Sequence, residues 1–200
     1  MTRGNLYIIS APSGAGKTTL ARRLNEALPD TAFSISHTTR PRRRNETDGV
    51  DYHFVSEKEF RDMVDRGEFL EYARVFGNWY GTSKAAVRSL VEQGKTVLLD
   101  IDWQGARHVR RKMPGCLSIF ILPPSLEELE RRLRARAQDA DTVIQERMEQ
   151  ARDEIRHAGE YEFVVVNDDF DRALGELCAI VSGERSPDAS HRRRSESIEP

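Results

Sequence analysis

The sequence has few cysteines, no long apolar run and almost no net charge. Its two cysteines, Cys116 and Cys178, lie far apart without CxxC spacing, and we expect reduced packing residues in a cytoplasmic protein. No run reaches the roughly 18 apolar residues of a membrane span, and the N-terminus lacks the apolar stretch of a signal peptide. A net charge of −2 gives no reason to expect nucleic acid as a partner, so any cationic site must be local.

Metal-ligand spacing is also missing. We expect the five scattered histidines on the surface or in packing: His37, His53, His108, His157 and His191. We likewise expect Trp79 and Trp103 to pack against other side chains rather than to stack on a ligand. These residue types therefore predict no functional site.

The end of the sequence lacks apolar anchors. From about Gly183 it reads GERSPDASHRRRSESIEP, which cannot bury enough surface to offset the entropy of ordering. We predict a disordered tail over residues 186–200. We expect its HRRR run to be solvated, and contact with RNA or a phosphorylated partner is the alternative.

Four short apolar runs are continuous rather than alternating. They are LYIIS (Leu6–Ser10), VLLDI (Val97–Ile101), LSIFIL (Leu117–Leu122) and FVVVN (Phe163–Asn167). Such runs are typical of strands covered on both faces, as in a parallel sheet. Amphipathic segments lie between them, with capping-box spacing at Ser56–Glu59 and Ser125–Glu128 and a glycine stop at Gly94. The alternation predicts one α/β domain of doubly wound type.

Residues 33–82 and 132–147 interrupt this alternation. The first segment mixes short strand-like and helix-like stretches, and we predict an inserted lobe with a small mixed sheet. The second begins RLRARAQDADT, is rich in arginine and is flanked by helices, so we predict a mobile lid. The predicted core domain comprises residues 1–32, 83–131 and 148–185.

The stretch ISAPSGAGKTTL, residues 9–20, has the features of a phosphate-binding loop (P-loop). It follows a predicted strand and precedes a predicted helix, as such a loop requires. Gly14 and Gly16 let backbone N–H groups converge on phosphate oxygens at a helix N-terminus. Lys17 would reach the β- and γ-phosphates, and Thr18 would offer its hydroxyl to Mg²⁺. The usual first glycine is Ala11 here, and a plain glycine turn is the alternative; the loop does not distinguish a kinase, a GTPase and another ATPase.

A second cluster narrows the choice. The stretch SISHTTRPRRRNETDGVDYHF, residues 34–54, has four arginines within five residues and Tyr52 nearby. Arginines with aromatic hydroxyls suit phosphate capture, although a run of charges alone is more often a solvated loop. Its SxxxR, further arginine, glutamate and GxxYxF resemble the nucleoside-monophosphate lobe of guanylate kinases. FLEYARVFGNWYGTS, LLDIDWQG, IFILPPS, RRLRARAQD and VNDDF resemble the same family in the same order, over about residues 6–185.

The resemblance implies the P-loop kinase fold, with a central parallel five-stranded sheet flanked by helices, an inserted GMP-binding lobe and a mobile lid. It implies a cytoplasmic enzyme of purine nucleotide metabolism that transfers the γ-phosphoryl group of ATP to GMP, and also to dGMP, with Mg²⁺ as cofactor. The implied partners are these small molecules, without a membrane or nucleic acid.

The resemblance also assigns residues to parts of the site. Those implied to bind ATP are Ala11, Pro12, Ser13, Gly14, Ala15, Gly16, Lys17, Thr18 and Asn167, the last near the adenine. Those implied to hold the GMP phosphate are Arg40, Arg43, Tyr52 and Tyr80, and those facing the guanine are Ser36, Glu71, Thr82 and Asp102. The transferring phosphoryl group would be surrounded by Lys17, Arg132, Arg136 and Arg147, and the metal or its waters would contact Thr18 and Asp100.

The chemistry of guanine explains these residue types. Guanine presents N1–H and an N2 amino group on one edge, and the ionised carboxylate of Glu71 can accept from both. Adenine offers an acceptor at N1 and would leave the carboxylate unpaired, which a buried site penalises. Hydroxyls of Ser36 and Thr82 can donate to guanine O6. The sequence therefore predicts a preference for guanine.

Three positions depart from the family pattern. Asn45 stands where glycine is frequent, and we expect the turn to form because asparagine tolerates left-handed conformations. Ala135 and Ala137 replace lid glycines. Because alanine favours helix, we expect a stiffer lid or a longer preceding helix.

Two other functions were weighed against this one. A kinase for a different monophosphate is disfavoured by Glu71 and Thr82. A kinase-like domain that acts only as a protein-binding module tends to lose the loop lysine or the lid arginines. This chain keeps all of them: Lys17, Arg132, Arg136 and Arg147. The sequence thus favours an enzyme.

Overall fold

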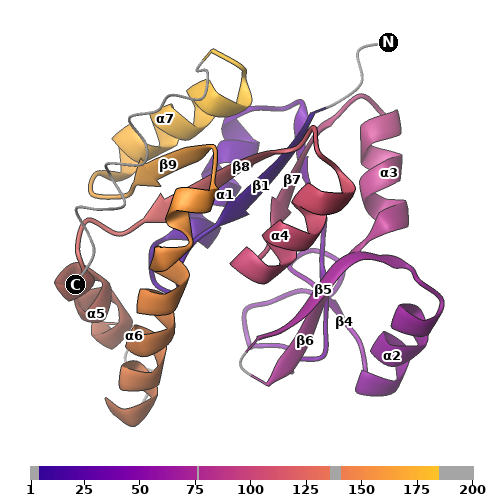
Figure 1. Ribbon diagram of the computed structural model, residues 1–200, viewed down its shortest axis with the longest axis horizontal. Helices are drawn as coiled ribbons and strands as arrows, with labels where there is room; N and C mark the ends of the chain where they lie inside the picture. Colours follow the sequence, from indigo (N-terminus) through magenta and orange to yellow (C-terminus); the bar gives the residue numbers. More distant parts are fainter. Residues whose placement is uncertain (1–4, 76, 136–140, 185–200) are drawn as a thin grey trace. The chain divides into compact units, whose positions relative to one another are not determined.

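Strands and helices alternate along most of the chain (Figure 1). The computed structural model describes residues 5–75, 77–135 and 141–184. The strands are β1 (Leu6–Ser10), β2 (Thr31–Phe33), β3 (His37–Thr38), β4 (His53–Phe54), β5 (Phe69–Val75), β6 (Asn78–Ser83), β7 (Thr96–Asp100), β8 (Leu117–Leu122) and β9 (Phe163–Val166). The helices are α1 (Lys17–Ala27), α2 (Glu57–Asp65), α3 (Lys84–Glu92), α4 (Trp103–Lys112), α5 (Leu126–Ala135), α6 (Asp141–Arg156), the short η1 (Ala158–Glu160) and α7 (Phe170–Val181). None of the helices in these ranges is long and apolar enough to cross a membrane.

The larger sheet has five strands in the order β2-β7-β1-β8-β9. Strand β2 pairs parallel with β7, and β8 pairs parallel with β9. Every residue of β1 is buried, as are five of the six residues of β8, which explains why their apolar runs are continuous. The predicted parallel five-stranded sheet is confirmed. Its edge strand β2 has only three residues, so no apolar run marked it in the sequence.

A second, four-stranded sheet has the order β4-β3-β6-β5 and confirms the predicted small mixed sheet. Strands β3 and β4 are parallel, whereas β6 is antiparallel to both β3 and β5. The register of β5 shifts between Phe69 and Glu71, which is the position of a β-bulge. Beyond the shift Glu71 lies opposite Thr82, so the two side chains share one face of the sheet.

The chain forms two compact units. The first comprises Met1–Ile8 and Asp30–Cys116 and contains the four-stranded sheet. The second comprises Ile9–Pro29 and Leu117–Pro200 and contains the P-loop stretch with helices α5 to α7. The predicted core, lobe and lid have other boundaries and remain a prediction. The predicted disordered tail, residues 186–200, lies outside the described residues, as do Arg136 and Ala137.

Helix ends follow local signals in the sequence. Helix α2 begins with a complete capping box between Ser56 and Glu59, and α3 is followed by Gly94 in the left-handed region (φ 77°). The Ser125 hydroxyl accepts a hydrogen bond from the backbone N–H of Glu128 (3.2 Å). Helix α5 continues through Arg132 to Ala135, so the start of the predicted lid is helical; a stiffer lid stays a prediction.

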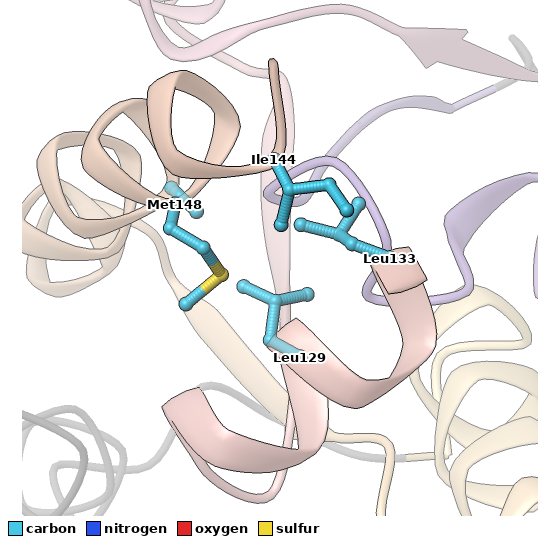
Figure 2. Packing of buried hydrophobic residues seen from close by; sticks show 5 residues of the cluster. Leu129, Leu133, Ile144 and Met148 are labelled. Carbon is cyan, nitrogen blue, oxygen red and sulfur yellow. The ribbon is translucent and has the colours of Figure 1, made fainter. Parts of the chain in front are cut away.

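In the second unit, an apolar cluster packs α5 against α6. Figure 2 shows Leu129 and Leu133 of α5 pointing toward Ile144 and Met148 of α6. The same leucines touch the P-loop, because a Cβ atom at Gly14 would come within 2.9 Å of Leu129 and 3.0 Å of Leu133. Helix α5 is therefore held directly against this loop.

Candidate active site

In the second unit, the P-loop stretch has the backbone that phosphate binding requires. It leaves β1, turns with a hydrogen bond from the Ala15 N–H to the Pro12 carbonyl (3.1 Å), and enters α1 at Lys17. Gly14 and Gly16 have φ values of 98° and 96°, in the left-handed region that favours glycine. Gly16 is the N-cap of α1, so the N–H groups of the first turn, which include those of Lys17 and Thr18, lie at the helix N-terminus.

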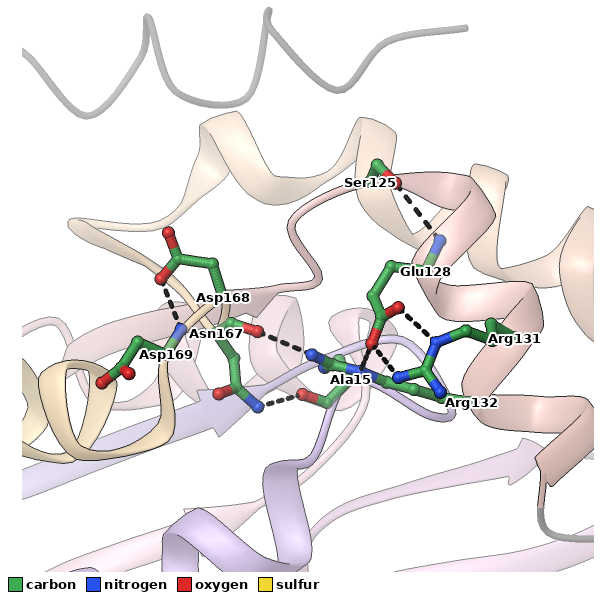
Figure 3. Close-up of polar contacts among 8 residues, drawn as sticks. All are labelled: Ala15, Ser125, Glu128, Arg131, Arg132, Asn167, Asp168 and Asp169. Carbon is green, nitrogen blue, oxygen red and sulfur yellow. Dashed lines mark hydrogen bonds and ion pairs between the residues drawn. The ribbon is translucent and has the colours of Figure 1, made fainter.

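Asn167 connects this loop to α5. It is 6% exposed and follows β9, where its backbone N–H donates to the Leu122 carbonyl (2.8 Å). Its Nδ2 donates to the Ala15 carbonyl (2.7 Å), and its own carbonyl accepts from an Nη of Arg132 (3.1 Å; Figure 3). A Cβ atom at Gly16 would collide with the Asn167 amide, so glycine is needed there for space as well as for φ.

A cavity of about 470 Å³ opens beside these residues. It is lined by Gly14, Gly16, Thr19, Arg131, Arg132, Ala135, Asn167, Asp168 and Phe170, all of the second unit. The cavity brings together predicted residues of the loop, of α5 and of the segment after β9. Its size, its left-handed glycines and its two guanidinium groups suit a nucleotide with phosphates.

Two further residues of the predicted phosphoryl-transfer set, Lys17 and Arg147, lie on helices α1 and α6 of the second unit. Lys17 is the first residue of α1, and Arg147 is a half-buried residue of α6, one position before the cluster residue Met148. Arg136, the fourth cation of the predicted phosphoryl-transfer set, lies outside the described residues.

In the first unit, Glu71 and Thr82 form a buried pair. Glu71 is 4% exposed and Thr82 is fully buried, and the Thr82 hydroxyl donates to Glu71 Oε1 (2.5 Å). Gly105 of α4 lies against the other oxygen, because a Cβ atom there would come within 2.5 Å of Glu71 Oε2. Ser36 is 9% exposed and lies one residue before β3. The Thr82 hydroxyl thus orients Glu71, and its expected contact with guanine O6 stays a prediction.

Burial changes the ionisation of Glu71. Removal from water raises the pKa of Glu71 to about 7, and the charge of Asp102 acts in the same direction. The hydrogen bonds from Thr82 and the charge of Lys112 oppose the rise without cancelling it. Lys112 itself donates to the Leu70 carbonyl (2.6 Å), next to Glu71 in the chain. The carboxyl group therefore changes charge near neutral pH.

The residues predicted to hold the GMP phosphate form a second group in the first unit. An Nη of Arg40 donates to Glu46 Oε1 (2.7 Å), and the guanidinium lies 5.5 Å from the centre of the Tyr52 ring. The Tyr52 and Tyr80 rings are 5.9 Å apart. Burial raises the pKa of Tyr52, so its hydroxyl stays protonated and can donate a hydrogen bond.

Arg43 joins this group through its backbone. Its side chain is exposed, while its N–H donates to Glu46 Oε2 (2.8 Å). The Glu46 N–H donates a hydrogen bond to the Arg43 carbonyl (3.1 Å), so the turn that contains Asn45 does form. Burial alone would raise the pKa of Glu46, but the hydrogen bonds from Arg40 and Arg43 lower it. As an ionised carboxylate, Glu46 thus holds the Arg40 guanidinium and the Arg43 backbone.

Asp100 and Asp102 follow one another at the end of β7. Asp100 is the last residue of the strand, and its charge contributes to the raised pKa of Tyr52. Asp102 is the N-cap of α4, where its Oδ1 accepts from the Gly105 N–H (2.8 Å). The structure therefore gives Asp102 a capping role besides the predicted contact with guanine.

The donor set for a metal consists of hard oxygen atoms. In the described residues, no group of three or more histidine, cysteine, aspartate or glutamate side chains could hold a metal ion. The predicted contacts, the Thr18 hydroxyl and the Asp100 carboxylate, fit Mg²⁺ that is held mainly by nucleotide phosphates and water.

Several residues of the candidate site were given no role by the sequence analysis. Glu46, Gly105 and Glu128 are recognised only by their contacts with Arg40, Glu71 and Arg132. Arg131 and Phe170 line the cavity, and both lie in stretches that resemble the family, RRLRARAQD and VNDDF, without having been assigned a role. The sequence marked Glu46 only as the glutamate of the Arg40 motif and Glu128 only by its capping-box spacing, so no local pattern indicated their contacts.

Comparison with known proteins points to one family. A family model described as guanylate kinase matches residues 3–184. The chain is 57% identical over 182 residues to a guanylate kinase of Alkalilimnicola ehrlichii (91% of this chain, 90% of the relative). It is 56% identical over 187 residues to a guanylate kinase of Vibrio cholerae (92% and 90%). The crystal structure of guanylate kinase from Anaplasma phagocytophilum superposes with a TM-score of 0.76 at 35% identity, covering 96% of this chain and 90% of that one.

Proposed function

The chain belongs to the guanylate kinase family, and on this premise we propose that it transfers the γ-phosphoryl group of ATP to GMP, giving ADP and GDP. A GMP phosphate oxygen forms the new bond to the γ-phosphorus, and the bond from that phosphorus to the β,γ-bridging oxygen breaks. We include dGMP as a substrate and the cytoplasm as the location. Cys116 and Cys178 both lie in the described part of the chain and form no disulfide, which fits a reducing compartment.

The residues divide this work between binding and transfer. The P-loop and Asn167 hold ATP in the second unit. In the first unit Arg40, Arg43, Tyr52 and Tyr80 hold the GMP phosphate, and Ser36, Glu71, Thr82 and Asp102 read the guanine. Lys17, Arg132, Arg136 and Arg147 neutralise charge on the transferring group, because phosphoryl transfer depends mainly on alignment and electrostatic stabilisation. Thr18 and Asp100 are the residues that would contact Mg²⁺ or its waters, and the ion, bound with ATP, would supply further neutralisation of phosphate charge.

The observation that carries substrate choice is the buried pair of Glu71 and Thr82. With one oxygen oriented by Thr82 and the other beside Gly105, the Glu71 carboxylate has a fixed direction. As an anion it can only accept, which suits the N1–H and N2–H donors of guanine. The alternative of a protein-binding module is not favoured, because the relatives are guanylate kinases and the loop glycines keep their phosphate-binding conformation.

The proposal is tested with Glu71→Gln in a coupled ADP-release assay against GMP, dGMP, AMP, CMP and UMP. The amide nitrogen is a donor facing a guanine donor, so we expect a loss of about 2–4 kcal/mol in transition-state binding, or roughly 30- to 1000-fold in kcat/KM for GMP. Activity with AMP should change less. The matched control is Glu68→Gln, an exposed glutamate paired with Arg66, which should behave as wild type. Equal losses for GMP and AMP would contradict the role of Glu71.

A further inference from the structure

Glu128 of α5 carries more hydrogen bonds than an ordinary helix-surface glutamate. Its Oε1 accepts from Arg132 Nε (2.8 Å) and from an Nη of Arg131 (2.8 Å), and its Oε2 accepts from Arg131 Nε (2.6 Å; Figure 3). These bonds lower the pKa of Glu128 to about 2, with Arg131 as the larger cause. The carboxylate is therefore ionised at any pH at which a kinase assay is run.

The bond to Arg132 begins a continuous chain that ends in the P-loop. From Arg132 an Nη donates to the Asn167 carbonyl, and from Asn167 the Nδ2 donates to the Ala15 carbonyl. Glu128 thus fixes one end of the Arg132 guanidinium and Asn167 fixes the other. Two bonds to one planar group set its orientation as well as its position.

Packing holds the helix but does not orient the arginine. Leu129 and Leu133, the neighbours of Glu128 and Arg132 in the chain, are buried against α6 and Gly14 (Figure 2). The Arg132 side chain is 25% exposed, and so is that of Glu128. A long side chain at a partly open site has several rotamers, so the polar partners decide its direction.

We propose that Glu128 is a positioning residue that aims the Arg132 guanidinium at the phosphates of the bound nucleotide. Among the described contacts, Glu128 and Asn167 use two of the five N–H donors of Arg132. The other three can serve phosphate oxygens in the cavity that Gly14, Gly16 and Arg132 line. This inference rests on the proposed role of Arg132 in phosphoryl transfer.

If Glu128 only stabilised helix α5, its loss should have the same effect as the loss of any similar ion pair on that helix. The chain contains such a pair for comparison. Glu130 and Arg134 form another i,i+4 pair on the same helix, at the same 2.8 Å, with side chains 44% and 47% exposed, respectively. Each pair stabilises the helix only slightly. Only the Glu128 pair continues to Asn167 and the loop, so only its loss should affect the transferring phosphate.

The experiment compares Glu128→Gln with Glu130→Gln by steady-state kinetics and thermal unfolding. Glutamine keeps an acceptor but loses the charge-assisted bond, and we expect kcat to fall about tenfold with the KM for ATP changed less than threefold. Glu130→Gln should leave kcat unchanged, and both variants should unfold within a few degrees of wild type. If Glu128→Gln is folded and has wild-type kcat, or if both variants lose kcat equally, the positioning role is wrong.

A double-mutant cycle separates this inference from its premise. Arg132→Ala alone should lower kcat at least about a hundredfold, the scale of one lost transition-state contact. Adding Glu128→Gln in that background should cost less than twofold, because its target is gone. If the Arg132→Ala variant had the kcat of the wild type, the proposed role of Arg132 would be wrong. Additive losses would overturn only the claim that Glu128 acts through Arg132.

Discussion

Glu71 shows how a single buried residue can combine a functional need with a cost in stability. In its proposed role the carboxylate must be ionised to accept from guanine, yet burial makes the ionised form unfavourable and raises the pKa of Glu71 to about 7. Thr82 and Lys112 offset part of this cost. The residue therefore binds a proton readily when no guanine faces it.

This shift predicts a pH-dependent stability difference for Glu71→Gln. The folded-state pKa, about 7, lies above the usual value of 4.5, so the folded protein binds more protons between these pH values. Protonated Glu71 makes its full contribution to the free energy of unfolding below about pH 4.5, and this contribution is lost as the pH rises through 7. Glutamine mimics the protonated form, so the variant should gain up to about 3 kcal/mol over wild type at pH 8 and little at pH 5.

The measurement is the melting temperature of both proteins at pH 5 and pH 8 without nucleotide. Glu68→Gln is again the control, because the hydrogen bond from Arg66 lowers the pKa of Glu68 and gives no such gain. An equal difference between Glu71→Gln and wild type at the two pH values would show that Glu71 does not titrate in this range.

At the scale of elements, helix α4 is shaped by the carboxyl group beside it. Its third residue is Gly105, although glycine is a poor residue for a helix. Asp102 caps its N–H, and Glu71 occupies the space where a Cβ atom would be. Glycine at position 105 thus lowers the helix propensity of α4 but leaves the space that the Glu71 side chain of β5 occupies.

Gly105→Ala is therefore expected to affect activity more than folding. Alanine gains up to about 1 kcal/mol in helix propensity, but its Cβ would lie 2.5 Å from Glu71 Oε2 and must displace the carboxylate. We expect kcat/KM for GMP to fall at least about tenfold, the effect of losing about 1.4 kcal/mol, in a protein that still folds. The measurement is kcat/KM for GMP together with the melting temperature.

Gly175 in α7 is the matched control, because nothing lies within 4 Å of a Cβ atom there. Gly175→Ala should raise the melting temperature and leave kcat/KM unchanged. If Gly105→Ala retained wild-type kcat/KM for GMP, the fit between α4 and Glu71 would not matter for the substrate.

At the scale of the whole molecule, each compact unit carries one set of predicted ligand residues. The residues assigned to GMP lie in the first unit, at positions 36–82 and 102, whereas the P-loop and Asn167 lie in the second. A ligand that binds one set should slow hydrogen exchange mainly in that unit, since it stabilises the folded form of what it touches.

We predict that GMP slows amide exchange in residues 36–54, 69–83 and 102–106. A non-hydrolysable ATP analogue with Mg²⁺ should instead slow it in residues 11–20 and 167–170. The measurement is hydrogen exchange followed by mass spectrometry of peptides, with Glu71→Gln expected to weaken the GMP pattern at a fixed ligand concentration. Protection by GMP that is confined to the second unit would contradict the assignment.

The sequence by itself determined the sheet, the loop and the family. Continuous apolar runs at Leu6–Ser10 and Leu117–Leu122 predicted β1 and β8 with their observed bounds, because burial on both faces leaves a local signal. The glycines of SGAGK predicted a turn that brings backbone N–H groups together, and both adopt the left-handed backbone that glycine allows, because the requirement for φ is local too. These features depend on neighbours in the chain and can be read from it.

Only the tertiary structure determined which residues of the candidate site contact one another. Glu46, Glu128 and Gly105 resemble ordinary surface or helix residues until Arg40, Arg132 and Glu71 are placed beside them. The hydrogen bond from the Thr82 hydroxyl to Glu71 follows from the β5–β6 register, which no local pattern in the sequence reveals. Hydrogen bonds and pKa values depend on distances of a few ångströms between residues far apart in sequence, and those distances exist only once the chain has folded.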